Sequence, residues 1–328
     1  MRTFGASARV VALLLGAGLA GFGCGGGDTS SPTPPASPTP ASSASPSLVT
    51  DTDPIVAAAG DIACGPLTAP SLETCHDFDT SELIVAMKPA LVLALGDLQY
   101  EDAKLEDFGR YYDSSWGRFK PITRPAAGNH EYQLYADARG YFDYFNGLGV
   151  PDGPAGPRGR GYYSFNLGAW HVVALNSNCD RIGGCQQGST QWTWLRNDLR
   201  ASSAPCTLAY WHHPRFSSGR NGSTASMQAI WALLVEQGAD LVLAGHDHSY
   251  ERFARLDALG RVDARGVRQI VAGTGGRSLY AFGAPLAGSE IRVSQFGALR
   301  LVLRPRGYEW ELIGIGATVH DLGADTCS

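Results

Sequence analysis

The stretch Asp240-Leu-Val-Leu-Ala-Gly-His-Asp-His248 joins a short apolar run to two histidines that flank an acid. Apolar runs of about four to eight residues bounded by turn signals are typical of buried strands. Gly245 allows the backbone to turn sharply where this strand ends. A purely structural role for two imidazoles and a carboxylate on one tight turn is hard to find. The stretch therefore predicts a strand that delivers metal-binding side chains to the edge of a sheet.

Three further apolar runs end in the same way, and helical patterns lie between them. Strands that alternate with helices indicate an α/β domain, in which ligand sites lie at the carboxyl ends of the strands. The runs, with the residues that follow them, are 55–59 with Gly60-Asp61, 90–95 with Gly96-Asp97, and 206–211 with His212-His213-Pro214. Helices are predicted at 81–87, 191–199 and 226–237, and late strands at 267–272, 298–303 and 308–315.

Five short motifs carry the side chains suited to binding metal. Oxygen and imidazole ligands together suit iron, zinc, manganese and similar ions rather than a metal that prefers thiolates. Each motif alone is a weak signal, because Gly-Asp is common in turns and a lone histidine is usually structural. All five in one chain indicate a shared metal centre. They are Gly60-Asp61, Gly96-Asp97-Leu98-Gln99-Tyr100, Gly128-Asn129-His130-Glu131, His212-His213-Pro214 and Gly245-His246-Asp247-His248.

With these motifs the chain resembles the metallophosphoesterase superfamily, and within it the purple acid phosphatases. Tyr100, three residues after Asp97, decides this narrower resemblance, because superfamily members in general have no tyrosine there. The stretch 245–252 also matches the Gly-His-x-His-x-Tyr-Glu-Arg signature of the purple acid phosphatases. The resemblance covers residues 54–315 and implies an α/β fold of four layers. In this α-β-β-α sandwich, two mixed sheets pack face to face and helices flank both outer sides.

The resemblance also implies two metal ions bridged by Asp97. A phenolate and carboxylates stabilise a trivalent hard ion, so Fe(III) is expected at the Tyr100 site. Neutral Asn and His ligands suit a divalent ion, zinc, iron or manganese, at the second site. The alternative is two divalent ions, with Tyr100 only forming a hydrogen bond nearby. The implied ligands are Asp61, Asp97, Tyr100 and His248 for the first ion and Asp97, Asn129, His212 and His246 for the second.

Four further residues are candidates for contact with the substrate. The resemblance places His130 beside the phosphate, where it helps to stabilise charge or to protonate the leaving group, and the alternative is a role in orienting other groups. His213 is expected to point away from its neighbour His212, because side chains alternate along a strand. The family's extra substrate-contacting histidines have no match between the fourth and fifth motifs, because residues 214–245 contain no histidine. Arg215 and Arg220 could supply positive charge there instead, or could be solvated loop residues.

The implied function is hydrolysis of phosphomonoesters by in-line attack of metal-bound hydroxide. A phosphodiesterase or nucleotidase on the same metal site is the nearest alternative, since pocket loops rather than ligands decide that choice. A surface-anchored binding protein that keeps the fold without catalysis is a third. A small phosphorylated substrate is the expected partner. The formal net charge of -5 excludes the basic excess of a non-specific nucleic-acid binder.

The first fifty residues predict export. Arg2, Arg9 and a short apolar run make residues 1–23 an export signal. Cleavage after Ala20 would release a soluble protein, whereas cleavage before Cys24 would leave a cysteine that carries lipid. We expect a bacterial lipoprotein held to the membrane only through Cys24, with a periplasmic or secreted protein as the alternative. Residues 24–50 are rich in Ser, Thr and Pro and predict a disordered tether, and residues 51–328 form the catalytic domain.

Six cysteines remain when Cys24 is set aside, an even number in a chain that leaves the reducing cytoplasm. Two pairs are close in sequence and flank polar, glycine-rich loops, and the third pair follows by elimination. The predicted disulfides are Cys64–Cys75, Cys179–Cys185 and Cys206–Cys327.

Overall fold

The computed structural model describes residues 53–328, in which the strands form two sheets. The predicted export signal, the lipid site at Cys24 and the tether over 24–50 lie outside the described residues. Among the residues described, no helix has the length and apolar character needed to cross a bilayer.

The first sheet has six strands in the order β13-β12-β11-β1-β2-β3. Strands β1, β2 and β3 run parallel, and the remaining pairs are antiparallel. Parallel strands covered on both faces are apolar throughout, as the Ile-Val-Ala-Ala-Ala sequence of β1 illustrates. The bounds are β1 Ile55–Ala59, β2 Leu91–Leu95, β3 Thr123–Ala126, β11 Gly297–Arg304, β12 Gly307–Gly314 and β13 Thr318–Thr326.

The second sheet has seven strands in the order β10-β8-β9-β7-β6-β5-β4. Its centre, β9-β7-β6-β5, is parallel, and antiparallel strands close it on both sides. The bounds are β4 Tyr163–Leu167, β5 Trp170–Ala174, β6 Cys206–Tyr210, β7 Leu241–Ala244, β8 Tyr250–Leu256, β9 Val267–Ala272 and β10 Ser289–Val293.

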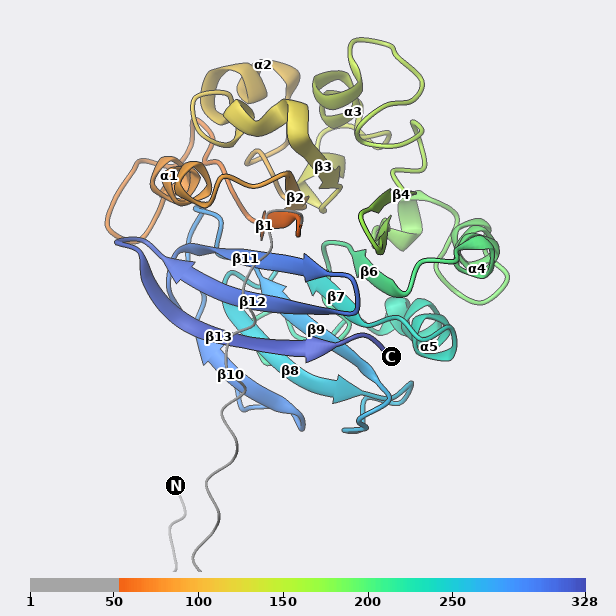
Figure 1. Cartoon of the computed structure of the whole chain (residues 1–328). Coiled ribbons are helices and arrows are strands. Elements are labelled where there is room, and N and C mark those ends of the chain that lie inside the picture. The colour runs from red at the N-terminus through yellow and green to blue at the C-terminus, as the bar shows by residue number, and fades with distance from the viewer. Residues whose placement is uncertain (1–52) are drawn as a thin grey trace, which may run out of the picture. The chain divides into compact units, whose positions relative to one another are not determined.

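Three buried apolar clusters define four layers. The first lies between the sheets and joins side chains such as Leu93 and Leu301 to Leu208 and Leu243. The second packs α1 and α3 on the six-stranded sheet, and the third packs α4 and α5 on the seven-stranded sheet (Figure 1). The predicted α-β-β-α sandwich of two mixed sheets is therefore confirmed. The helices are α1 Asp77–Met87, α2 Leu105–Asp107, α3 Arg139–Asn146, α4 Thr190–Ala201 and α5 Gln228–Glu236, with short 3-10 or π turns at Phe108–Tyr112, Trp116–Ile122, His130–Tyr132, Cys179–Arg181 and Ala225–Met227.

All three predicted disulfides are present: Cys64–Cys75, Cys179–Cys185 and Cys206–Cys327. The third joins the first residue of β6 to the end of the chain across 121 residues, so the C-terminal strand is held beside a central strand. A loop of that length restricts the unfolded chain by about 4–5 kcal/mol in the chain-entropy model. Three disulfides are typical of a protein that leaves the reducing cytoplasm.

Candidate metal centre

The carboxyl ends of β1 and β2 in one sheet meet those of β6 and β7 in the other. Hydrogen bonds cross between the sheets at this point. The His246 amide donates to Asp61 Oδ2 at 2.8 Å, and His212 Nδ1 donates to the Leu95 carbonyl at 2.8 Å. Asp61, Asp97 and His246 all have positive φ angles of 50–69°. The chain thus turns sharply after each strand and directs the next side chain into the space between the sheets.

The first predicted ligand group is gathered in one place. Tyr100 Oη lies 3.0 Å from Asp61 Oδ1, 3.2 Å from Asp97 Oδ2 and 3.1 Å from His248 Nε2. His248 Nε2 lies 3.2 Å from Asp61 Oδ1. The Nδ1 atom of His248 is 2.9 Å from Ser278 Oγ, which fixes the ring. Four atoms that could bind a metal, from the segments that follow β1, β2 and β7, therefore face a common point.

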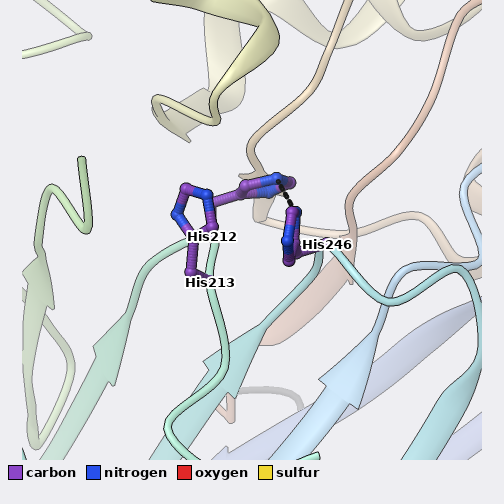
Figure 2. Close-up of side chains that lie close together, drawn as sticks. All are labelled: His212, His213 and His246. Carbon is purple, nitrogen blue, oxygen red and sulfur yellow. Dashed lines mark hydrogen bonds between the residues drawn. The ribbon is translucent and has the colours of Figure 1, made fainter. Parts of the chain in front are cut away.

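The second group shares Asp97 with the first. His212 Nε2 lies 3.1 Å from Asp97 Oδ2 and 3.2 Å from His246 Nδ1. Figure 2 shows the rings of His212 and His246 joined by this contact, with His213 next to them. Asn129 Oδ1 is buried and has no hydrogen-bond partner among the described residues. A buried amide oxygen without a donor is costly, and a cation would satisfy it.

The donor set fits two metal ions. Carboxylate, phenol and amide oxygens and imidazole nitrogens are the ligand types for iron, zinc and manganese. Glycines leave room around them, because a Cβ on Gly128 would lie 2.2 Å from Asp97 Oδ1 and one on Gly96 would lie 2.5 Å from His212 Nδ1. No larger residue fits at either position without moving a predicted ligand.

The electrostatics of the cluster are dominated by burial and by the acids. Burial opposes ionisation of Asp97, but the surrounding imidazoles, that of His212 above all, together outweigh it and hold the pKa of Asp97 well below its usual range. Burial lowers the pKa of His212, but the carboxylates of Asp97 and Asp61 and the hydrogen bond to the Leu95 carbonyl together raise it to about 9. Burial, Asp61 and Asp97 raise the pKa of the Tyr100 phenol well above its ordinary value. The carboxylates thus concentrate negative potential between the sheets, which attracts cations.

The two further histidines lie at the rim of the cluster. His130 Nδ1 bonds the Glu101 carbonyl, and its Nε2 is 3.9 Å from Asp97 Oδ2. The expectation that His213 points away from the cluster was wrong, since its ring centre is 4.3 Å from that of His246. Residues 211–213 follow the end of β6, so strand alternation no longer applies to them. His213 Nδ1 is engaged by Ser177 Oγ at 2.8 Å.

The model of the calcineurin-like phosphoesterases matches residues 56–250, more than half of the chain and every strand that ends in a predicted ligand. This chain belongs to the calcineurin-like phosphoesterase family. Within the family it is similar to purple acid phosphatases, as the resemblance through Tyr100 implied. Purple acid phosphatase 15 of Arabidopsis thaliana is 29% identical over 234 residues, which are 62% of this chain and 43% of that protein.

Two further relatives set the extent of the similarity. An uncharacterized protein of Mycobacterium tuberculosis is 29% identical over 220 residues, 61% of this chain and 41% of that protein. The solved structure of a purple acid phosphatase from yellow lupin seeds superposes with a TM-score of 0.67 at 20% identity, covering 84% of this chain and 54% of that chain. The chain spans less than half the length of these two curated relatives, and the lupin structure supports the fold alone.

Glu131 is a residue of this calcineurin-like centre to which the sequence motif assigned no role. Its buried carboxylate accepts the backbone N–H groups of Asp97 at 2.9 Å, Leu98 at 2.8 Å and Gly128 at 2.6 Å. Burial and the neighbouring Asp97 raise the pKa of Glu131 to about 7. Glu131 therefore ties the loop after β3 to the turn that presents Asp97. An acid after Gly-Asn-His was visible in the sequence, but its three partners were not.

Asp247, between the two histidines of the last motif, fixes a loop at the rim of the centre. Ser217 Oγ donates to its carboxylate, and the Asn221 amide donates at 2.7 Å. This loop carries Arg220, whose guanidinium lies 5.1 Å from the ring centre of Tyr280. Tyr280 in turn stacks on His248 with ring centres 4.0 Å apart. Tyr280 thus lies between the rim loop and the centre, in contact with both Arg220 and the predicted ligand His248.

Arg215, the other arginine proposed to contact the substrate, is held elsewhere. Its Nε donates to Gln228 Oε1 at 2.9 Å at the start of α5, and its guanidinium lies over the Phe216 ring at 4.4 Å. The structure therefore links Arg220 to the centre through Tyr280 and leaves Arg215 in the packing between its own loop and α5.

Proposed function

We propose that this chain is a binuclear-metal phosphatase that hydrolyses phosphomonoesters. The observation that carries the proposal is the contact of Tyr100 Oη with Asp61, Asp97 and His248, all within 3.0–3.2 Å. A tyrosine hydroxyl inside a group of carboxylate and imidazole donors is the feature by which the chain resembles purple acid phosphatases rather than the wider family.

Seven residues would hold the two ions. Asp61, Tyr100 and His248 would hold Fe(III), and Asp97 would bridge it to a divalent zinc, iron or manganese ion. The second ion would take Asn129, His212 and His246 besides Asp97. When bound, such a pair of ions neutralises charge on a phosphoryl group and activates water for attack.

The chain's own residues would position the ester around that pair. His130 has its Nδ1 engaged by the Glu101 carbonyl, so its Nε2 is the atom left to contact the phosphoryl or leaving-group oxygen. The Arg220 guanidinium lies against the Tyr280 ring, which in turn stacks on His248. A guanidinium in that position would bind phosphate oxygens through its planar donor fork.

We also propose that the enzyme acts outside the cytoplasm, as the three disulfides support. Residues 51–328 would form the catalytic domain, and a lipid on Cys24 would hold it at a membrane surface through the Ser/Thr/Pro-rich tether. Release of the protein by Cys24→Ala, which leaves residues 1–23 in place, with membrane retention of the unaltered chain, would support the anchor. Equal solubility of both forms would contradict it.

Hydrolysis of 4-nitrophenyl phosphate and bis(4-nitrophenyl) phosphate by the metal-loaded protein tests the proposed activity. We expect kcat/KM for the monoester to exceed that for the diester by at least about tenfold, a difference of about 1.4 kcal/mol in transition-state binding. A diester rate equal to or above the monoester rate would favour the phosphodiesterase alternative. No activity on either ester in protein that contains metal would favour a non-catalytic binding protein.

The two arginines provide matched variants in the same assay. Arg220→Gln should raise KM for the monoester severalfold, because it removes the cation beside Tyr280. Arg215→Gln should leave KM unchanged, because that guanidinium bonds Gln228 instead. Equal effects of both substitutions would contradict the role given to Arg220.

A further inference from the structure

A cavity of about 620 Å³ opens beside the predicted metal ligands. Asn129 and His213 line it on the side of the metal centre, and the loop after β5 lines it through residues 177–181. Its volume is within the range of about 300–1,000 Å³ that small-molecule sites occupy. A phosphoryl group held at Asn129 would therefore have this cavity open to the alcohol part of the ester.

The loop that lines the cavity is held rigidly. The Cys179–Cys185 disulfide closes it into a small ring. At the base of the loop, the backbone N–H of Asn176 donates to Gln191 Oε1 at 2.8 Å. The side-chain Nδ2 of Asn176 donates to Tyr132 Oη at 2.7 Å. Tyr132 belongs to the turn that begins at His130. The loop is thus fixed both to α4 and to the segment that carries His130, and a preorganised wall loses little entropy on binding.

Most residues that line the cavity have polar side chains, and they include one arginine, Arg181, and one acid, Asp180. Hydroxyl and amide side chains also line the cavity, among them Ser177, Asn178 and Thr224. Among the residues that the structure describes, the only ion pair of Arg181 is with its neighbour Asp180, from Nε to Oδ2 at 3.3 Å. Both side chains are exposed, at 42% and 77%, and exposed pairs of this kind contribute little. The guanidinium therefore retains donors for an anionic group in the cavity.

We propose that this cavity binds the alcohol part of the substrate and that Arg181 selects phosphomonoesters whose alcohol carries a second anionic group, of which a carboxylate is the simplest. The inference rests on the proposed phosphatase activity and adds a substrate class to it. Arg181 is a specificity residue, since it contacts the part of the substrate that does not react. The Cys179–Cys185 disulfide constrains the backbone segment that carries Arg181.

Two substrates that differ in a single group test the proposal. Glycerol 2-phosphate and 2-phosphoglycerate are the same ester except that a carboxylate replaces one hydroxymethyl group. The wild-type enzyme should favour 2-phosphoglycerate by about tenfold in kcat/KM, as expected for one charge-assisted hydrogen-bonded contact. Arg181→Gln should remove this preference through KM and leave the kinetics of glycerol 2-phosphate within about twofold. Arg200→Gln, an exposed arginine of α4 outside the cavity lining, is the matched control and should change neither substrate.

A binding measurement gives a second readout. Glycerate, the alcohol product that carries the carboxylate, should inhibit the wild-type enzyme more strongly than glycerol does, and Arg181→Gln should abolish the difference. A preference for 2-phosphoglycerate that survives Arg181→Gln would overturn the proposal, as would equal use of both substrates by the wild-type enzyme. Failure to hydrolyse 4-nitrophenyl phosphate as well would instead overturn the phosphatase assignment on which the proposal rests.

Discussion

Replacing Asp97 with asparagine should lower phosphatase activity by at least about 10³-fold in kcat/KM, equivalent to about 4 kcal/mol of transition-state stabilisation. Asp97 Oδ2 lies near donors of both predicted metal sites, 3.2 Å from Tyr100 Oη and 3.1 Å from His212 Nε2. The substitution keeps the shape of the side chain but removes its negative charge. Both ions would then be poorly neutralised, so the metal content of the purified protein should fall together with the activity.

Asp137→Asn is the control for this substitution. Asp137 is an exposed acid whose one ion pair within residues 53–328 is with Arg139 at 3.2 Å, so the change in net charge is the same and the metal centre is untouched. Its activity should equal that of the wild type. An Asp97→Asn protein that keeps both metal ions and most of its activity would show that the bridging position has been assigned to the wrong residue.

Glu131→Ala should have the largest effect on stability. The substitution leaves the backbone N–H groups of Asp97, Leu98 and Gly128 without their acceptor. Each buried donor left without a partner costs about 1–3 kcal/mol. Because three donors lose their acceptor, the free energy of unfolding should fall by about 3–5 kcal/mol. The loss is measured as the shift in the midpoint of denaturant unfolding at constant slope.

Glu106→Ala provides the comparison, because Glu106 is an exposed residue of α2. Its unfolding midpoint should match that of the wild type. If Glu131→Ala unfolds at the same denaturant concentration as Glu106→Ala, then Glu131 does not hold the turn that presents Asp97.

The parts of the fold that the sequence predicted are those with a strong local signal. The central parallel strands are buried on both faces, so β1, β2, β6 and β7 appear as continuous apolar runs, and their bounds were predicted to within one residue at each end. β13 was missed because residues 318–326, apart from the buried Asp321, are exposed or partly covered at the edge of a sheet, and their sequence resembles a polar tail. Its place in the sheet depends on pairing with β12 and on the disulfide to Cys206.

In the candidate site, too, some parts could be predicted from the sequence and others could not. The motifs could be found because four of the five begin with a glycine and most follow an apolar run, and the resemblance to purple acid phosphatases assigned their residues as ligands. The strand ends bring these residues together. Contacts that depend on side-chain direction in loops could not be assigned. Arg215 and Arg220 lie in one Ser/Gly loop and look equivalent in sequence, but only the structure shows that Gln228 holds the first and Tyr280 supports the second. The role of Glu131 as a hydrogen-bond acceptor likewise could not be predicted, because its three donors are backbone N–H groups from two separate turns.

The visible absorption spectrum of the purified protein, recorded with the metal content of the same sample, tests the central claim most directly. We expect two metal ions per chain, one of them iron, and a charge-transfer band from the Tyr100 phenolate to Fe(III). Tyr100→Phe removes a single hydroxyl and should abolish the band while the protein stays folded. A colourless protein that is fully active with two zinc ions, and whose activity is unchanged by Tyr100→Phe, would contradict the assignment of an iron-phenolate centre.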